Sequence, residues 1–355
     1  MISILIAGNS GTYDATQFVD VITWSGEYTQ CSRSLNFNLV MEQENPAVRC
    51  ELGNAVVFKV DGRLLFDGFI VSRQKSTGSN KIEIQCFDRG LYLKRNKGVY
   101  KFSGTTAENV VKRVCGDFGI PAGEIAQTGV PITRNFIGIN LYDIIMTAYT
   151  LAAEKTGASY LPVFKGGKLC VVEKRVNDET IIIEGGANLM EASCTESIEK
   201  MVNQVVIYNK DDRIIKTLKD DAAIQAYGLM QEYIKQGDDG SEADKKAQKL
   251  LDDNGYSQKM TVEALGDTSN ITGGTVVVRE PYTGVYGLFY IDSDTHTWKN
   301  GLYFNKMVVN FKNIMDETEA GNLPKSSSGK SGKKGAKKGS SGTWSGYVNK
   351  PGEEQ

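Results

Sequence analysis

The first part of the chain alternates between apolar and polar residues with a period of two. The apolar positions of three such runs are Ile2, Ile4 and Ile6, then Leu35, Phe37 and Leu39, and then Ile82, Ile84 and Cys86. This period is typical of strands that bury one face. Many short strands hide their edges best in a small barrel or closed sandwich. The pattern therefore predicts an all-β barrel domain over residues 1–98.

Two distant stretches, residues 56–88 and 275–311, predict the same strand arrangement although their sequences differ. Each reads as an apolar strand, a Gly-containing turn, an aromatic-rich strand, a polar crossover and an alternating strand. Asp61-Gly62 indicates a two-residue hairpin, because both central residues of a type I′ turn need positive φ. A repeated β-module lets a few copies build a ring with twice as many quasi-equivalent positions. The repeat therefore indicates an assembly component.

Helical periodicity begins after residue 100. Thr105 and Glu108 fit a capping box, and the apolar face that follows comprises Val110, Val111, Val114, Cys115 and Phe118. The run Gly119-Ile120-Pro121 should end this helix. A second helix is expected from about Asn140 to Gly157, followed by strands over 159–164 and 168–176. Residues 99–180 are therefore predicted to form a small α+β domain with two helices and a hairpin.

Strand patterns return over 181–208 and again from 259 to 311. Between them the sequence predicts two helices. The first begins at Asp220-Asp221 and runs to about Gln236, and the second is capped by Ser241 and ends at Asn254-Gly255. The simplest organisation is a second β-barrel over 181–212 and 256–316, interrupted by a helical insertion over 213–255.

Residues 317–355 are predicted to form a flexible tail. From Pro324 the tail is rich in Lys, Gly and Ser and cannot bury a core. Its lysines would keep it soluble, and contact with an acidic partner surface or with phosphates is the alternative. Trp344 and Tyr347 follow this stretch. Paired aromatic residues make good anchors in a partner's pocket, so both are candidate partner-binding residues, with a frayed terminus as the alternative.

Composition adds limits to this scheme. Charged residues are 24% of the chain, hydrophobic residues 40%, and the net charge is −2, as in ordinary soluble proteins with no global attraction to nucleic acid or anionic membranes. The six cysteines form no CxxC pair, which favours reduced thiols in a protein made in the cytosol. We expect neither a signal peptide nor a membrane helix.

Candidate chemistry is sparse. His296 is the only histidine and lies between Asp292, Asp294 and Trp298. It could serve as a general base or metal ligand, or simply bond to the backbone or to Asp294 at a strand end. The same stretch lacks the Gly and Glu of a calcium loop, since Tyr303 stands at the Glu position. No GxGxxG or GxSxG motif occurs. We therefore predict no enzymatic activity, no cofactor and no metal site.

Several segments resemble a known family. LFDGFI (65–70) followed by IQCFDRGLYL (84–93) is similar to the first tube-like domain of phage tail hub proteins. Residues 285–311 resemble the closing strands of the PBSX-type prophage hub, which belongs with the late-control-D group and the central hub of T-even baseplates. Residues 201–212 resemble the strand that enters the second barrel there. The resemblance covers roughly residues 1–315 and marks both barrels as tube-like.

The resemblance implies a mainly β protein with α+β parts: two tube-like β-barrel domains, a small α+β domain and a helical insertion. It further implies a homotrimer that adapts a six-fold tail tube to a three-fold spike. The implied partners are the tail tube protein, the spike, other baseplate proteins and, as a further candidate, the tape measure protein. Neither nucleic acid nor a membrane is implied. A C-terminal cell-wall hydrolase, found in some relatives, is replaced here by the Lys/Gly/Ser tail.

Two functional hypotheses follow. The leading one is a structural baseplate hub of a contractile phage tail or tail-like bacteriocin, assembled in the bacterial cytoplasm and released by lysis. The alternative is a β module that binds or hydrolyses the cell wall, with Asp292, Asp294 and His296 in its site. Mass in solution and binding to tail tube protein or to peptidoglycan would separate them.

Overall fold

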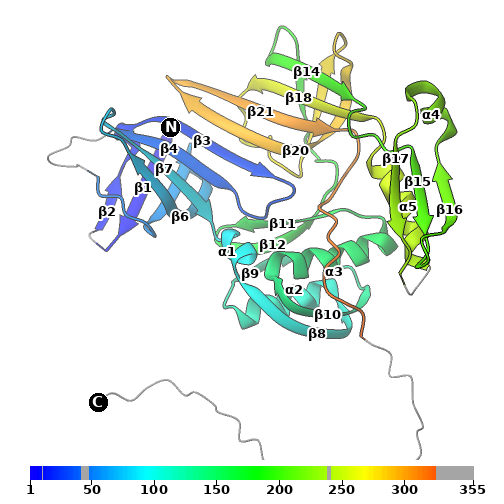
Figure 1. The fold of residues 1–355 in the computed structure, drawn as a ribbon. Coiled ribbons are helices and arrows are strands. Elements are labelled where there is room, and N and C mark those ends of the chain that lie inside the picture. Colours follow the sequence, from blue (N-terminus) through cyan, green and yellow to red (C-terminus); the bar gives the residue numbers. More distant parts are fainter. Residues whose placement is uncertain (10, 41–47, 238–240, 325–355) are drawn as a thin grey trace, which may run out of the picture.

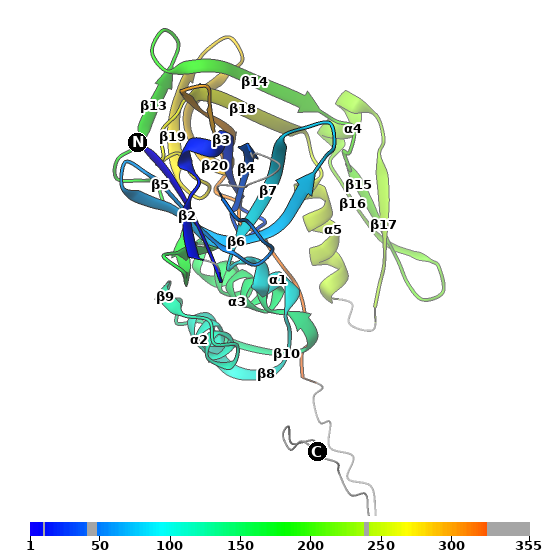
Figure 2. The ribbon, with the colours of Figure 1, turned by 90° about the vertical axis from the view of Figure 1, so that its left-hand side faces the viewer.

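The computed structural model describes residues 1–9, 11–40, 48–237 and 241–324. As predicted, the protein is mainly β with α+β parts. Its central element is a 13-stranded sheet that contains strands from both halves of the chain (Figure 1). An α+β domain lies below this sheet, and a smaller unit built on α5 lies at its side (Figure 2). The fold is thus organised around one large sheet.

The N-terminal strands form the first β-module. They are β1 (Ile2–Gly8), β2 (Gly11–Asp14), β3 (Val19–Glu27), β4 (Ser34–Val40), β5 (Ala55–Val60), β6 (Arg63–Lys75) and β7 (Lys81–Asp88). The predicted alternation is confirmed, because Ile4, Leu35 and Ile82, one from each predicted run, share one buried core. The predicted hairpin is also confirmed: Asp61 and Gly62 both have positive φ, 49° and 78°, between β5 and β6.

A second β-module comes from the C-terminal half. Its strands are β13 (Ile181–Glu184), β14 (Leu189–Ser197), β18 (Ser257–Leu265), β19 (Thr275–Glu280), β20 (Val285–Lys299) and β21 (Leu302–Asn310). The pairing order β14-β18-β21-β20-β19 corresponds strand for strand to β3-β4-β7-β6-β5. The predicted internal repeat is therefore confirmed as a strand arrangement.

The two modules agree down to single hydrogen bonds. In each, the long strand changes register against the next strand, β6 against β7 after Ile70 and β20 against β21 after Ile291. The Ile70 N–H donates to Asn54 O, and Ile70 O accepts from Gly53 N. Ile291 makes the same two bonds with Gly274 and Gly273. A bulge bends and twists a strand, so both long strands bend at the same place.

The sequence did not predict how the modules join. The C-terminal half of β20 pairs antiparallel with β3, from Ser293 opposite Glu27 to Lys299 opposite Val21. The two predicted β domains therefore share one continuous sheet.

The α+β domain contains α1 (Leu91–Arg95), β8 (Lys97–Thr106), α2 (Ala107–Asp117), β9 (Ala122–Ile125), β10 (Pro131–Asn140), α3 (Leu141–Thr156), β11 (Tyr160–Lys165) and β12 (Lys168–Glu173). The second predicted helix is confirmed as α3. Asn140 caps it by accepting from the Asp143 N–H at 2.8 Å, and Gly157 ends it with φ 70°. The apolar faces of α2 and α3 pack into one core.

Three local predictions in this region were wrong. The capping box at α2 does not form, because the Glu108 carboxylate accepts from the Thr128 N–H and hydroxyl at 3.1 and 2.9 Å instead. Phe118, expected on the buried face, is 39% exposed because α2 ends before it. The strand expected over 84–93 also ends early: β7 stops at Asp88, and α1 follows after Gly90.

The insertion is larger and less helical than predicted. It contains β15 (Gln204–Tyr208), β16 (Ile214–Lys219), α4 (Asp221–Tyr227), β17 (Gln231–Lys235) and α5 (Ser241–Asp253). The first helix ends at Gly228, which has φ 85°, instead of continuing to Gln236. β15 was expected to enter the second barrel, but it pairs with β16 and β17. The reason is a separate small core that includes Val205, Ile207 and Ala247.

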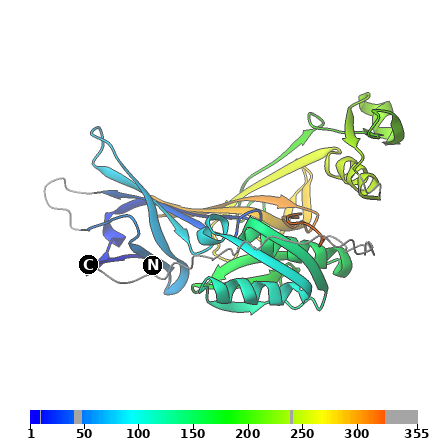
Figure 3. The same cartoon turned by 60° about the horizontal axis from the view of Figure 1, so that its bottom comes forward.

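The insertion starts and ends at one point of the large sheet. Ser197 and Ser257 are paired residues of β14 and β18, and the segment between them folds outward (Figure 3).

The predicted tail begins later than residue 317. After β21 the chain runs back over the α+β domain. There the Ser159 hydroxyl donates to Asn313 O at 2.9 Å, and Asn135 and Asn322 exchange backbone bonds. Trp344 and Tyr347 lie outside the described residues. Within the described part of the chain, no helix is both long and apolar enough to cross a membrane.

Candidate functional site

His296 lies on β20 with no exposed surface. Its Nδ1 is 2.6 Å from the Asn305 amide nitrogen and 2.7 Å from the Tyr303 hydroxyl. Because an amide nitrogen can only donate, Nδ1 accepts and the ring proton is on Nε2. Asp294 Oδ2 is 3.1 Å from Nε2, although this contact is not aligned as a hydrogen bond. The imidazole is therefore held from both sides inside the protein.

Asp294 is the centre of this group. Its side chain is buried and forms a bidentate contact with the Arg33 guanidinium, with Nη1 at 2.9 Å from Oδ1. The Thr272 N–H and hydroxyl also donate to Oδ1, at 2.7 and 2.6 Å. Burial alone would raise the pKa of Asp294, but the Arg33 charge, the hydrogen bonds from Arg33 and the nearby His296 ring outweigh this effect and lower the pKa. Asp294 is therefore a paired carboxylate at neutral pH.

This network lies at the joint between the β-modules. Arg33 comes from the segment before β4, and its guanidinium stacks over the Trp24 ring at 3.9 Å. Gly26 on β3 stands opposite Asp294, and a Cβ atom there would collide with the Arg33 guanidinium. The first module thus supplies the cation and the second module the anion. The arrangement fastens β3 to β20.

Asp292 does not belong to this network. It is 6% exposed, and burial raises its pKa while a hydrogen bond from Asn310 and the charge of Lys174 oppose the shift. Of the three residues of the alternative enzyme site, Asp294 and His296 therefore lie together, whereas Asp292 has separate surroundings. Among the described residues no group of three or more His, Cys, Asp or Glu side chains is placed to hold a metal ion.

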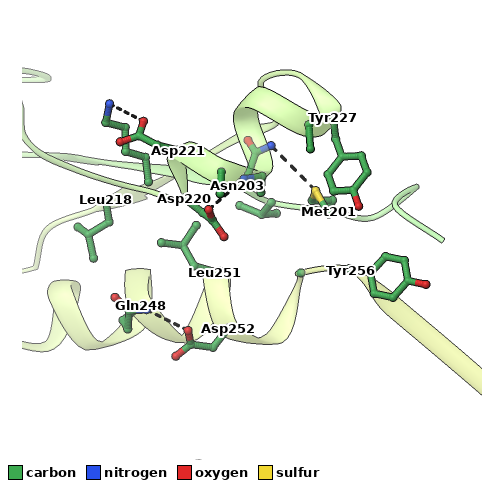
Figure 4. Close-up of a pocket in the computed structure, with 16 residues that line it drawn as sticks. Met201, Asn203, Leu218, Asp220, Asp221, Tyr227, Gln248, Leu251, Asp252 and Tyr256 are labelled. Carbon is green, nitrogen blue, oxygen red and sulfur yellow. Dashed lines mark hydrogen bonds and ion pairs between the residues drawn. The ribbon is translucent and has the colours of Figure 1, made fainter. Parts of the chain in front are cut away.

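Two cavities could accept a partner. One, in the insertion, has a volume of about 830 Å³ and lies between α4, α5 and the segment at Met201–Asn203. Leu251 points from α5 toward Asn203 and Asp220 (Figure 4). The Asn203 amide is already used, since it donates to Gly228 O at 2.6 Å and accepts from the Met230 N–H at 2.8 Å. The cavity offers apolar walls rimmed by acidic side chains.

The second cavity, of about 790 Å³, lies where β6, the β11–β12 hairpin and the segment 268–274 meet. Asp88 is on its wall and is 5% exposed. Its carboxylate accepts from the Arg33 N–H at 3.0 Å and the Gly90 N–H at 2.8 Å. Burial raises the pKa of Asp88 to about 6, against the opposing effect of those two bonds. This carboxyl therefore titrates close to neutral pH.

Sequence reasoning found Asp294 and His296 but missed Arg33 and Trp24. Arg33 sits in a polar turn, where nothing in the local pattern distinguishes it from a solvated side chain. A usable signal was Asp294 itself, because a carboxylate at an inward position of a strand needs a paired cation.

Comparisons with known proteins agree with this architecture. A family model described as YQBQ-like matches residues 22–310. The phage-like element PBSX protein XkdQ of Bacillus subtilis is 27% identical over 305 residues, covering 83% of this chain and 93% of XkdQ.

Two solved structures share the fold. The 43 kDa tail protein of prophage MuSo2 from Shewanella oneidensis superimposes with a TM-score of 0.68 at 14% identity, covering 87% of this chain and 98% of that one. The E. coli c3393 protein is described as a type VI secretion component with structural similarity to the T4 tail proteins gp27 and gp5. It gives a TM-score of 0.50 at 11% identity, covering 86% and 76%.

Proposed function

Because the chain belongs to the YQBQ-like family, we propose that it is a structural hub protein in the baseplate of a contractile phage tail or a tail-like bacteriocin. The observation that carries this proposal is the pair of equivalent β-modules joined edge to edge within one chain. A module that already joins to its own duplicate has the geometry of a ring component. The names and folds of the relatives support the same role.

We infer that the protein is a homotrimer. Two equivalent modules in each of three copies occupy six quasi-equivalent positions. Such a ring can meet a six-fold tail tube on one side and a three-fold spike on the other. In this assembly the two β-modules, rather than the α+β domain, form most of the ring, because only repeated elements can fill alternating positions.

The proposed role is structural rather than enzymatic. The support is the placement of Asp294 and His296, which are 1% and 0% exposed. The Asp294 carboxylate binds Arg33 of the first module, and the His296 ring bonds to Tyr303 and Asn305 on β21. The proposed partners are the tail tube protein, the spike, other baseplate proteins and the tape measure protein. Assembly would take place in the bacterial cytoplasm, and lysis would release the particle.

The test is the mass of the purified protein by analytical ultracentrifugation, followed by mixing with tail tube protein from the same particle. We expect a trimer that binds the tube, and a three-fold ring in low-resolution images. A monomer that instead binds or cleaves peptidoglycan would overturn the hub and favour the cell-wall module.

The C-terminal segment has a proposed role of its own. We propose that Trp344 and Tyr347 dock on the spike or a neighbouring baseplate protein, tethered by the Lys/Gly/Ser stretch, which raises the effective concentration of that contact. Deleting residues 324–355 should leave the trimer intact but weaken binding to one partner, most noticeably at high salt. Complete, functional particles at normal yield from the truncated protein would contradict docking.

A further inference from the structure

We propose that the outer edge of the C-terminal half of β6 pairs antiparallel with the outer edge of β14 from a second copy of this chain. This contact would repeat, between subunits, the β20–β3 joint seen within one subunit. The inference rests on the proposed self-association and adds to it the strands, the register and the charged pair at the interface.

The internal repeat identifies the two edges. β6 corresponds to β20 through the shared bulge at Ile70 and Ile291. β14 corresponds to β3, because β3 pairs with β4 as β14 pairs with β18. Both of these strands also change register near their start, after Val19 in β3 and after Leu189 in β14. Since β20 and β3 pair with each other, their counterparts β6 and β14 have edges that could pair in the same way but are unpaired within one chain.

The paired edge of β20 is buried, whereas the corresponding edge of β6 is exposed, as expected if β6 lacks its partner strand in a single chain. In β20, Asp294, His296 and Trp298 are buried beside β3. The corresponding part of β6, residues 71–75, is exposed throughout. β14 ends the sheet path, and among the described strands only β18 pairs with it. An exposed strand edge is a ready template for another chain, and proteins generally cover it.

The correspondence also fixes a register. Ser293 opposite Glu27 and Asp294 opposite Gly26 become Ser72 opposite Ser197 and Arg73 opposite Glu196. The next pairs are Gln74 opposite Thr195 and Lys75 opposite Cys194. This places an Arg across from a carboxylate, and opposite charges directly across an antiparallel pair are stabilising.

The internal joint has the same kind of pair at the same place, with the signs exchanged. There the second module supplies Asp294 and the first supplies Arg33, whose guanidinium lies over Gly26. In the proposed joint the first module supplies Arg73 and the second supplies Glu196. Both side chains are exposed in the single chain, so neither needs to be released from a buried site.

The segment that contains Cys50 and Gly53 lies next to β6 but does not block the outer edge of the C-terminal half of this strand. Arg73 donates to Cys50 O, and the corresponding Asp294 accepts from the Thr272 N–H. The two partners lie in corresponding segments, Cys50 three residues before Gly53 and Thr272 one residue before Gly273. In the second module this neighbouring segment coexists with β3 on the edge of β20. The equivalent segment in the first module is therefore compatible with a strand beside β6.

The occupant is a second copy because β6 and β14 of one chain do not pair with each other and are separated by six strands along the sheet path. The contact joins two different edges, so it is head-to-tail and leaves β14 free on one copy and β6 free on the other. Such contacts either close into a ring or continue as a filament, and closure after three copies would produce the proposed trimer.

A single cysteine tests the register. Lys75→Cys places a thiol opposite the native Cys194 of the next copy, and opposed residues of an antiparallel pair are about 4.5–5.5 Å apart at Cα, within disulfide range. Mild oxidation with oxidised glutathione should then produce covalent dimers and larger multiples up to the ring size on a non-reducing gel. Adding Cys194→Ser should abolish them.

The matched control is Glu83→Cys, which is equally exposed but lies on β7, between two paired neighbours. It should give no ladder. If the Lys75→Cys protein has the wild-type oligomer mass but gives no more crosslinking than this control, the proposed pairing is wrong while the hub assignment stands. A protein that remains monomeric at all concentrations overturns both.

Charge exchange supplies a second, independent readout. Arg73→Glu and Glu196→Arg should each weaken self-association by roughly tenfold or less, and the double variant should restore it, because each single change sets like charges opposite one another. Circular dichroism checks that each variant is folded. Single variants that self-associate as strongly as the wild type would contradict the pairing. So would a double variant whose loss of self-association equals the sum of the losses of the two single variants.

Discussion

At the scale of single residues, Asp294 connects the halves of the molecule. Its carboxylate is buried and ion-paired, and its partner Arg33 is far away in sequence. A buried pair contributes little over an apolar replacement, but removing one partner leaves an uncompensated charge in the interior. The β3–β20 joint therefore depends on both members being present.

We expect Asp294→Asn to lower the free energy of unfolding by roughly 3–5 kcal/mol, measured by urea denaturation. The control is Asp244→Asn, which breaks an exposed pair with Lys216 at 2.7 Å. That change should cost less than about 1 kcal/mol. Equal losses for the two variants would mean that Asp294 does not hold the joint.

Asp88 predicts a pH effect. Its folded pKa, about 6, is above the unfolded value of about 3.9. Protonation therefore favours the folded state, and this contribution is fully present below the unfolded pKa and lost as pH rises through 6. The wild type should accordingly lose about 1 kcal/mol relative to Asp88→Asn between pH 5 and pH 7.

Unfolding free energies of both proteins at the two pH values measure this difference. Comparing pH values within each protein removes the constant cost of the hydrogen bond that an amide cannot accept. A difference that does not change with pH would show that the Asp88 carboxyl has an ordinary pKa in the folded protein.

At the scale of elements, α3 shows how local chemistry sets a boundary. Asn140 accepts from the Asp143 N–H at 2.8 Å and donates to its carboxylate at 2.7 Å. Asn140→Ala should therefore cost about 1 kcal/mol in thermal or denaturant unfolding. Asn140→Asp keeps a capping oxygen and should cost clearly less. If both variants lose the same stability, capping is not what Asn140 contributes.

Two hairpin turns show that local chemistry also sets the ends of strands. Asp61-Gly62 and Asn300-Gly301 adopt positive φ at both positions, and the sequence alone indicated this conformation for Asp61-Gly62. The bulges after Ile70 and Ile291 carry no comparable sequence mark, because their position is set by the neighbouring strands on both sides. Turns are local, whereas bulges belong to the sheet.

At the scale of the whole molecule, the insertion is separable. It leaves and re-enters the sheet at the paired residues Ser197 and Ser257, and it buries its own small core. Replacing residues 198–256 with an Asn-Gly turn should leave a folded protein, because the β14–β18 hairpin needs only a two-residue loop. Its oligomer mass should equal the wild-type state.

Circular dichroism and sedimentation measure this outcome. The exposed bridge between Lys249 and Glu317 is lost in this variant, so a small decrease in thermal stability is expected. An insoluble or unfolded product would show that the insertion is part of the folding unit of the second module.

The sequence by itself determined the local features of this protein. The period-two runs, the Asp61-Gly62 hairpin, the Asn140 cap and the Gly157 stop depend on nearby residues and their backbone preferences, so they could be predicted. The repeat of the two β-modules also followed from pattern, because each strand carries its own alternation.

Only the tertiary structure decided how these parts combine. Glu108 bonds to Thr128 instead of forming the predicted capping box. β15 packs in a small core of the insertion instead of the large sheet. Residues 317–322 contact the α+β domain. Arg33 binds Asp294 across the β3–β20 joint. In each case the deciding partner is distant in sequence, and contacts between distant segments form only where the fold brings both partners out of water together. Local preference sets the elements, and long-range burial sets their neighbours.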